Sequence, residues 1–274
     1  PAVGDYPVRL DANESFVPLP DSIKEEICSA VAKIDYRRYP EPIAEACLKN
    51  FAAIYGLDSD NLTAGNGSDE LISVILGGLF QRGDKILITR PDFSMYEFYA
   101  HMSELQAVSY IKKEYRIDVD ELIALSVREK CRGIIFSNPC NPTSQGISRE
   151  ETVKILEALP SSLIIVDEAY MEFWNQSVLD LINKYDNLIV LKTCSKAFGG
   201  AAIRLGFAVT NKSLTKTLRS IKSPYNVNSL TQAAGAVILS HRKCLNKAIE
   251  QILSSRDELY KCLTTLRQQP INEE

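Results

Sequence analysis

The stretch Leu188-Ile189-Val190-Leu191, followed at once by Lys192 and then by Thr193-Cys194-Ser195-Lys196-Ala197-Phe198, carries the strongest prediction about the fold. The apolar run is typical of a strand buried inside a sheet, so Lys196 stands where a strand ends and a loop begins. In open α/β sheets, ligands bind at that edge. We therefore expect Lys196 to lie at a ligand site.

Three side chains near this strand end have the chemistry of a cofactor site. Burial can lower the pKa of a lysine until it is a neutral, nucleophilic amine, which Schiff-base chemistry requires. Ser195 offers a hydroxyl donor, and Arg204 offers a fixed cation, which together suit a phosphate. A lysine beside a phosphate clamp suggests pyridoxal 5′-phosphate (PLP). Taken alone, the same residues also fit an exposed Ser-Lys loop with an unrelated arginine.

Apolar runs alternate with helical patterns along most of the chain. The runs expected to form strands are Lys85–Thr89, Ala107–Ile111, Gly133–Ser137, Leu163–Val166, Leu188–Leu191 and Leu205–Thr210. Helices are expected over Asp69–Phe80, Met95–Met102, Val119–Val127 and Arg149–Leu159, the last of them after a Ser148 cap. This alternation predicts an α/β fold with a mostly parallel sheet covered by helices on both faces.

The pattern changes after the last expected strand. Leu230–Leu266 is helical in pattern with a break near Ser240, which suggests a connection into a second, smaller domain. We expect an N-terminal segment over residues 1–35, a large PLP-binding domain over 36–240, and the start of an incomplete small domain over 241–274.

Composition narrows the range of partners. The 274 residues have a net charge of −4 with acidic and basic side chains mixed, so no nucleic-acid partner is expected. No apolar run reaches membrane-spanning length, and Pro1–Asp5 lacks a signal-peptide pattern. The seven cysteines contain no CxxC pair, so we expect no metal site and a cytoplasmic protein with reduced thiols. His101 and His241, each in an expected helix, give no support for a Ser-His-Asp hydrolase.

The stretch Gly65-Asn66-Gly67-Ser68-Asp69-Glu70 precedes an amphipathic helical pattern. Backbone N–H groups at a helix start bind phosphate, and glycines let the anion approach the backbone. Glu70 stands where a GxGxxG dinucleotide motif needs its third glycine, and the chain contains no GxxxxGK[ST] loop. The stretch therefore indicates a phosphate-binding helix start, with a simple capped turn as the alternative.

The expected strand Leu163–Val166 ends in Asp167-Glu168-Ala169-Tyr170. Two acids at a strand end also occur in nucleotide hydrolases, but no phosphate-binding lysine loop accompanies them here. With PLP, Asp167 would pair with the pyridine nitrogen through a charge-assisted hydrogen bond of roughly 1.5–3 kcal/mol. That pairing keeps the ring an electron sink. Tyr170 would reach the phenolic oxygen of the cofactor.

Two further strand ends offer groups for a cofactor ring. Asn141, held between prolines in Asn138-Pro139-Cys140-Asn141-Pro142-Thr143, is a donor suited to a cofactor hydroxyl. Phe93, in Arg90–Tyr96, is suited to stacking on a pyridine ring, a contact worth about 0.5–1.5 kcal/mol beyond burial. Each alone also fits a turn or a core residue, whereas four such strand ends together favour one site.

In this order, the motifs resemble those of the fold-type I PLP-dependent enzymes, and among them the histidinol-phosphate aminotransferase group. The resemblance covers nearly the whole chain and also includes Leu10–Glu14, Arg38–Pro42 and Pro224–Asn228. The chain departs from the pattern at Cys140 and Ser144, which stand in place of an asparagine and a glycine. Neither position supplies a required functional group, so we expect both changes to be tolerated.

The resemblance implies a PLP-dependent transaminase that converts histidinol phosphate and 2-oxoglutarate into imidazole acetol phosphate and glutamate, as part of histidine biosynthesis. Its implied catalytic residues are Lys196 as the Schiff-base lysine, Asp167 at the pyridinium and Tyr170 at the phenolic oxygen. The implied cofactor-binding residues are Ser68, Asp69, Phe93, Asn141, Asp167, Tyr170, Thr193, Ser195, Lys196 and Arg204, with Tyr39 supplied by the partner subunit of a homodimer.

Several alternatives remain at this stage. A threonine-phosphate decarboxylase-like enzyme shares most of the cofactor motifs, and an aromatic amino acid aminotransferase is a further option. Asn13-Glu14 and Tyr225–Asn228 favour the histidinol-phosphate group. A nucleotide-binding ATPase and a non-catalytic PLP-fold module of a regulator are the other classes, although no helix-turn-helix pattern supports the regulator. Because members of the group continue further, to the arginine that binds the substrate carboxylate, we expect this chain to bind PLP but to transaminate poorly.

Overall fold

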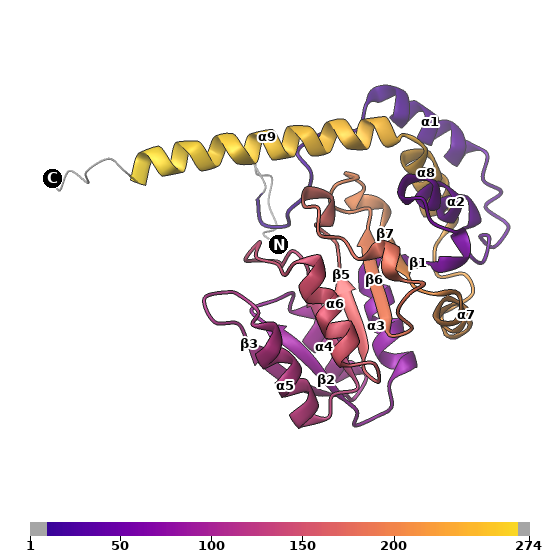
Figure 1. Cartoon of the computed structure of the whole chain (residues 1–274). Helices are drawn as coiled ribbons and strands as arrows, with labels where there is room; N and C mark the ends of the chain where they lie inside the picture. The colour runs from indigo at the N-terminus through magenta and orange to yellow at the C-terminus, as the bar shows by residue number, and fades with distance from the viewer. Residues whose placement is uncertain (1–9, 268–274) are drawn as a thin grey trace.

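The computed structural model describes residues 10–267 of the chain (Figure 1). Residues 1–5, considered above for a signal peptide, and residues 268–274 of the expected small domain lie outside this range. One seven-stranded sheet, in the order β1-β7-β6-β5-β4-β2-β3, forms the centre of the molecule. Its strands are β1 (Leu62–Asn66), β2 (Lys85–Arg90), β3 (Gln106–Ile111), β4 (Gly133–Ser137), β5 (Leu163–Asp167), β6 (Leu188–Thr193) and β7 (Leu205–Val209).

The sheet is mostly parallel, as predicted. β2 pairs in parallel with β3 and β4, and β5 pairs in parallel with β4 and β6. β7 is the exception, because it runs antiparallel to both β1 and β6. The carboxyl ends of β1, β2, β4, β5 and β6 therefore meet at one edge of the sheet, where β7 begins.

Helices cover both faces of the sheet, and alternate strand residues face each layer. Ile135, Ile165 and Ile189 pack with one cluster of helices, which comprises α3 (Gly67–Leu79), α4 (Met95–Met102) and α7 (Lys212–Ile221). Ile134 and Ile164 pack with the other cluster, which comprises α2 (Glu45–Tyr55), α5 (Val119–Glu129), α6 (Arg149–Ala158) and α8 (Ser229–Ser240). All these strand residues are fully buried, as a sheet covered on both sides requires.

Most of the predicted boundaries are correct to within two residues. Ser148 caps α6 as expected, because its Oγ accepts the Glu151 N–H at 3.1 Å while Glu151 accepts the Ser148 N–H at 2.7 Å. The sequence did not predict β1, and the prediction also omitted α1 (Asp21–Ala32), α2 and α7. Short 3₁₀ turns cover Ser59–Asn61, Met171–Phe173, Leu179–Leu181 and Ala201–Ile203.

The helical region after the sheet is divided as predicted. α8 ends at Ser240 and α9 (Arg242–Arg267) follows, so the break falls at His241. His241 was expected inside a helix and instead lies between the two helices, with its Nε2 3.0 Å from Glu26 Oε2 of α1. In Figure 1, α9 extends across the upper side of the molecule and beyond the sheet, while α1 packs against α8.

Two further findings apply to residues 10–267. No helix in this range is both long enough and apolar enough to cross a membrane. The seven cysteines all lie within it as free thiols.

Candidate active site

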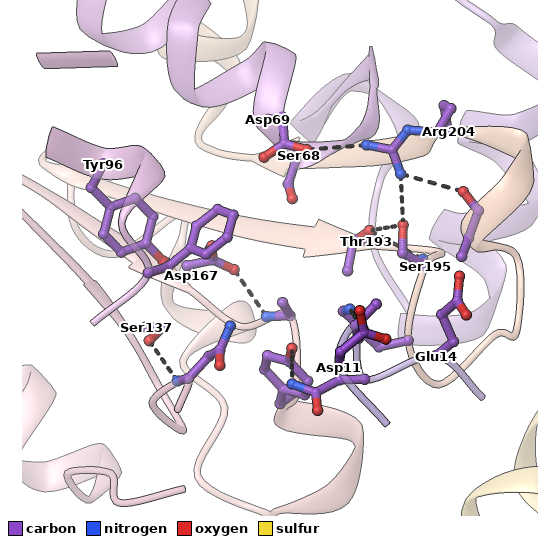
Figure 2. A pocket seen from close by; sticks show the side chains of 18 of the residues that line it. Asp11, Glu14, Ser68, Asp69, Tyr96, Ser137, Asp167, Thr193, Ser195 and Arg204 are labelled. Atoms are coloured by element: carbon purple, nitrogen blue, oxygen red, sulfur yellow. Dashed lines mark hydrogen bonds and ion pairs between the residues drawn. The ribbon is translucent and has the colours of Figure 1, made fainter. Parts of the chain in front are cut away.

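A cavity of about 540 Å³ lies at the edge of the sheet where the parallel strands end. It is lined by every site residue predicted from the sequence except Tyr39, namely Ser68, Asp69, Phe93, Asn141, Asp167, Tyr170, Thr193, Ser195, Lys196 and Arg204. Figure 2 shows Arg204 together with Asp69, Thr193 and Ser195, called the Arg204 group, at one end of this cavity. Asp167 and Tyr96 lie at the other end. Strand ends far apart in the sequence thus form one site.

At one end, Arg204 is held by a group of oxygen acceptors. Its Nη1 donates to Ser195 Oγ and to the Ala201 carbonyl, each at 3.3 Å, and its Nη2 donates to Asp69 Oδ2 at 3.0 Å. Thr193 Oγ1 lies 3.1 Å from Ser195 Oγ and accepts the Ser195 N–H at 3.1 Å. The guanidinium and both hydroxyls therefore have fixed positions, which favours the binding of a phosphate.

The first turn of α3 completes this end of the cavity. Gly67 has φ +79°, and a Cβ there would lie 2.7 Å from Arg204 Nη2. A Cβ on Gly206 of β7 would lie 2.4 Å from the Ser68 nitrogen, so only glycine lets β7 come this close to the helix start. Asn66 makes no side-chain capping bond, which leaves N–H groups of the first turn for an anion. A phosphate fits here, but the Asp69 carboxylate serves it only by orienting Arg204, because a carboxylate repels a phosphate.

At the other end, Asp167 is a buried carboxyl group with few partners. Its Oδ2 accepts a hydrogen bond from Tyr96 OH at 2.8 Å and its Oδ1 accepts one from the Ala169 N–H at 3.0 Å. Burial raises the pKa of Asp167 to about 6, against the lowering effect of these two hydrogen bonds. A cationic N–H facing Asp167 from the cavity would restore its charge, so a pyridinium nitrogen fits this position.

Lys196 lines the same cavity and is half-buried. Its Nζ donates to the Ala12 carbonyl at 2.7 Å and lies 5.7 Å from the centre of the Tyr170 ring. Burial lowers the pKa of Lys196, while the Glu14 carboxylate acts in the opposite direction. The lowered pKa makes the neutral amine more accessible than in an exposed lysine, which is the direction that Schiff-base chemistry needs.

The N-terminal segment Asp11–Glu14 forms part of the cavity wall, a role that the sequence motif had not specified. Asn13 Nδ2 donates to Tyr170 OH at 3.1 Å, so this segment orients a predicted site residue. Tyr96 was also missed. It lies three residues after Phe93 at the start of α4, and its hydroxyl becomes relevant only because Asp167 of another strand faces it.

Tyr39 is outside the cavity. Its ring stacks on that of Tyr225, with centroids 4.7 Å apart and an angle of 11° between the planes, and the residue is 80% exposed. Its predicted contribution to the site of a partner subunit stays a prediction.

The loop after β4 shows what one of the two sequence departures costs. Ser144 has φ +58°, the left-handed region that glycine adopts freely and other residues adopt at a cost of about 1 kcal/mol. The loop is closed by Asn138, which donates to the Ile147 carbonyl at 3.1 Å and accepts the Ile147 N–H at 2.9 Å. These two hydrogen bonds join the ends of the loop that contains Ser144, so the loop keeps its shape with serine at this position.

A second hollow of about 540 Å³ adjoins the first and shares Asn13, Glu14, Asn141, Tyr170 and Lys196 with it. The aromatic rings of Phe16, Phe173 and Trp174 form one part of its lining, and α9 contributes another part. A molecule held in this hollow lies directly beside Lys196.

The model of class I and II aminotransferases matches residues 5–274. The chain belongs to this family. Histidinol-phosphate aminotransferase of Clostridium novyi (strain NT) is 40% identical over 257 residues, which are 93% of this chain and 72% of that protein. Histidinol-phosphate aminotransferase of Pyrococcus furiosus is 35% identical over 257 residues, 93% of this chain and 74% of that protein.

Solved structures show the same fold. The histidinol-phosphate aminotransferase of Sinorhizobium meliloti, in complex with PLP, aligns with a TM-score of 0.83 at 24% identity, over 90% of this chain and 68% of that one. L-threonine-O-3-phosphate decarboxylase of Porphyromonas gingivalis aligns with a TM-score of 0.69 at 25% identity, over 81% and 65%. Family membership confirms the predicted fold type, the transaminase class and PLP as the cofactor, and it decides against the nucleotide-binding ATPase.

Proposed function

We propose that this aminotransferase takes its amino group from histidinol phosphate and passes it to 2-oxoglutarate, giving imidazole acetol phosphate and glutamate. The observation that carries the proposal is the meeting of Lys196, Asp167 and the Arg204 group in one cavity. The curated relatives at 34–40% identity, all named histidinol-phosphate aminotransferase, support this choice of amino donor.

Each part of the cavity has a role in this function. Ser68, Thr193, Ser195 and Arg204 would hold the PLP phosphate at the start of α3. Phe93 would lie against the ring, Asp167 would keep its nitrogen protonated, and Asn141 and Tyr170 would donate to its phenolic oxygen. When bound, PLP supplies an electron sink that stabilises the carbanion left after a Cα proton is removed.

Lys196 carries out the proton transfers. A neutral Nζ accepts the proton from the substrate Cα, and the lowered pKa of Lys196 favours that form relative to an exposed lysine. The Ala12 carbonyl, 2.7 Å away, holds Nζ, and Lys196 lines both hollows. The substrate side chain would then occupy the adjoining hollow beside Trp174.

The assembly belongs to the same proposal. A homodimer would let the exposed Tyr39 of one subunit reach the phosphate end of the partner's cavity. The stack of Tyr39 on Tyr225 supports this role, because the contact orients an exposed ring. We also propose that the chain divides into an N-terminal segment, a large domain and a second domain at residues 35 and 240, with α9 beginning the second domain.

Product analysis separates the leading function from its nearest alternative, since the structural likeness to the decarboxylase gives that alternative specific support. Purified protein is incubated with PLP, histidinol phosphate and 2-oxoglutarate, and with threonine phosphate in a parallel reaction. Glutamate formed only with histidinol phosphate supports the proposal. Release of CO2 from threonine phosphate, without glutamate, would overturn it, and glutamate formed with phenylalanine but not histidinol phosphate would indicate an aromatic donor.

A further inference from the structure

Behind the wall of the cavity lies a buried ion pair that the function described above does not use. Lys112, which directly follows β3, and Asp92, which follows β2, have side chains that are each 1% exposed, with Nζ and Oδ2 3.0 Å apart. Lys112 Nζ also donates to the Pro91 carbonyl at 2.9 Å and to Cys140 Sγ at 3.0 Å. All three N–H groups of this ammonium therefore have acceptors.

The Asp92 carboxylate is equally well satisfied. Its Oδ2 accepts from Thr89 Oγ1 at 2.6 Å and from the Ser137 N–H at 3.3 Å. Its Oδ1 accepts from the Phe93 N–H at 2.8 Å and from Ser137 Oγ. A buried ion pair persists only when hydrogen bonds satisfy both charges in this way.

The partners of this pair belong to the two loops that carry the residues expected at the cofactor ring. Asp92 binds the backbone N–H of Phe93 directly. Ser137 Oγ, which donates to Asp92, accepts the backbone N–H of Asn141 at 3.2 Å. Lys112 joins the same two loops a second time, through Pro91 on one side and Cys140 on the other.

We propose that Lys112 and Asp92 are positioning residues that fix the placement of Phe93 relative to Asn141 across the cavity. The proposal rests on the PLP site of the preceding section and adds the groups that make this site rigid. Cys140, which replaces the asparagine of the resembling group, has a function here as an acceptor for Lys112. A site on loops is held in place only if supporting groups fix its side chains.

The test uses PLP binding and absorbance, and needs no substrate. Lys112→Met is expected to weaken PLP binding on the order of tenfold, the loss seen when supporting groups behind a metal site are removed. The absorbance of bound PLP changes with pH, and we expect its midpoint to move by roughly 0.5 pH unit. The shift should have the same direction as in Asn141→Ala, because both changes weaken a donor to the phenolic oxygen. The double variant should show no further shift, because both changes act on one contact.

Three further variants make the result specific. Lys112→Arg keeps the cation and should restore most of the wild-type midpoint. Ser137→Ala breaks the link from Asp92 to Asn141 without leaving a buried charge, so it remains informative if Lys112→Met fails to fold. Lys85→Met is the matched control, because Lys85 forms an ion pair of the same 3.0 Å length with Glu129, at the opposite end of β2, where the side chains are 37% and 33% exposed. It should leave both PLP affinity and the midpoint unchanged.

The outcomes separate the two proposals. If wild-type protein binds no PLP, both the cofactor site and the positioning proposal are overturned. If it binds PLP while Lys112→Met and Ser137→Ala keep the wild-type affinity and midpoint, the positioning proposal alone is wrong, and any fall in their urea stability reflects folding only.

Discussion

Lys192 and Lys196 are only four residues apart along the chain, yet the structure places them in opposite electrostatic environments. Lys192 lies in β6 with its side chain 3% exposed, and its Nζ is 2.5 Å from Glu172 Oε1 and 3.4 Å from Glu168 Oε2. Burial alone would lower the pKa of Lys192, but the attraction of the two carboxylates raises it. Lys196 lies beyond the strand end, where burial prevails and lowers its pKa.

The difference shows that burial decides the charge of a lysine only together with its neighbours. Lys192 faces the side of the sheet where Tyr55 lies, with its Nζ 5.2 Å from the centre of that ring, and Tyr55 OH donates to Glu172 at 2.6 Å. Lys192, the two glutamates and Tyr55 thus form a buried network of charges and hydrogen bonds. Lys196 instead donates to a backbone carbonyl and lines a cavity, so Lys192 is suited to a structural role and Lys196 to a chemical one.

Replacing Lys196 should have the largest effect on activity. Lys196→Ala is expected to lower the transamination rate by about 10²–10⁴-fold, because the proton acceptor at Cα is lost. Lys196→Arg should be no better, since a guanidinium stays charged and cannot accept that proton. Initial rates of glutamate formation at saturating PLP measure the effect. Wild-type rates in Lys196→Arg would show that a neutral amine is not needed.

Replacing Lys192 should lower the stability of the fold instead. Lys192→Met leaves Glu168 and Glu172 buried without their cation, and the free energy of unfolding in urea should fall by about 3–5 kcal/mol. Changing both glutamates to glutamine in the same protein should recover most of that loss. Lys113→Met, at an exposed ion pair, is the control and should leave unfolding unchanged. Equal stability of the Lys192→Met and Lys113→Met proteins would contradict the assigned difference.

Asp167 extends the comparison to an acid that burial drives toward its neutral form. Its pKa rises from 3.8 to about 6 in the folded protein without PLP, so the folded state binds this proton more tightly than the unfolded state. Its contribution to stability is therefore present below pH 3.8 and is lost as the pH rises toward 6, a change of roughly 2–3 kcal/mol. In Asp167→Asn, urea unfolding between pH 4 and pH 7 should lack this decrease. If the free energy of unfolding of Asp167→Asn still falls between pH 4 and pH 7 as in the wild type, a group other than Asp167 causes the decrease.

The smallest expected effect concerns the environment of Lys196. The Glu14 carboxylate raises the pKa of Lys196, so Glu14→Gln should lower that pKa further and make the neutral amine available in more acidic solution. The rate at which PLP is incorporated into cofactor-free protein, followed by absorbance against pH, should show its acidic limb moved to lower pH. Glu25→Gln, an exposed acid on α1, should leave the profile in place. If the acidic limb moved to higher pH instead, Glu14 would lower the pKa of Lys196, contrary to the effect assigned to it.

Much of the fold could be predicted from local pattern. The runs at β4, β5 and β6 were recognised because they are uniformly apolar, as strands buried on both faces must be. β1 was missed because Leu62–Asn66 contains only two larger apolar or β-branched residues beside alanine, glycine and asparagine. It is a strand because it pairs with β7, which lies far away in the sequence. α1 and α2 were also missed, and neither has a side-chain hydrogen bond at its N-cap.

The sequence by itself determined that Lys196, Asp167 and Ser195 stand at strand ends, because strand periodicity and turn residues act over a few neighbours. Only the tertiary structure decided which charges these groups favour and what holds them in place. Lys112 meets Asp92 across 20 residues, and Lys192 meets Glu168 across 24. Burial and the distance between charges determine a pKa, and both arise only when separate strands come together in one sheet.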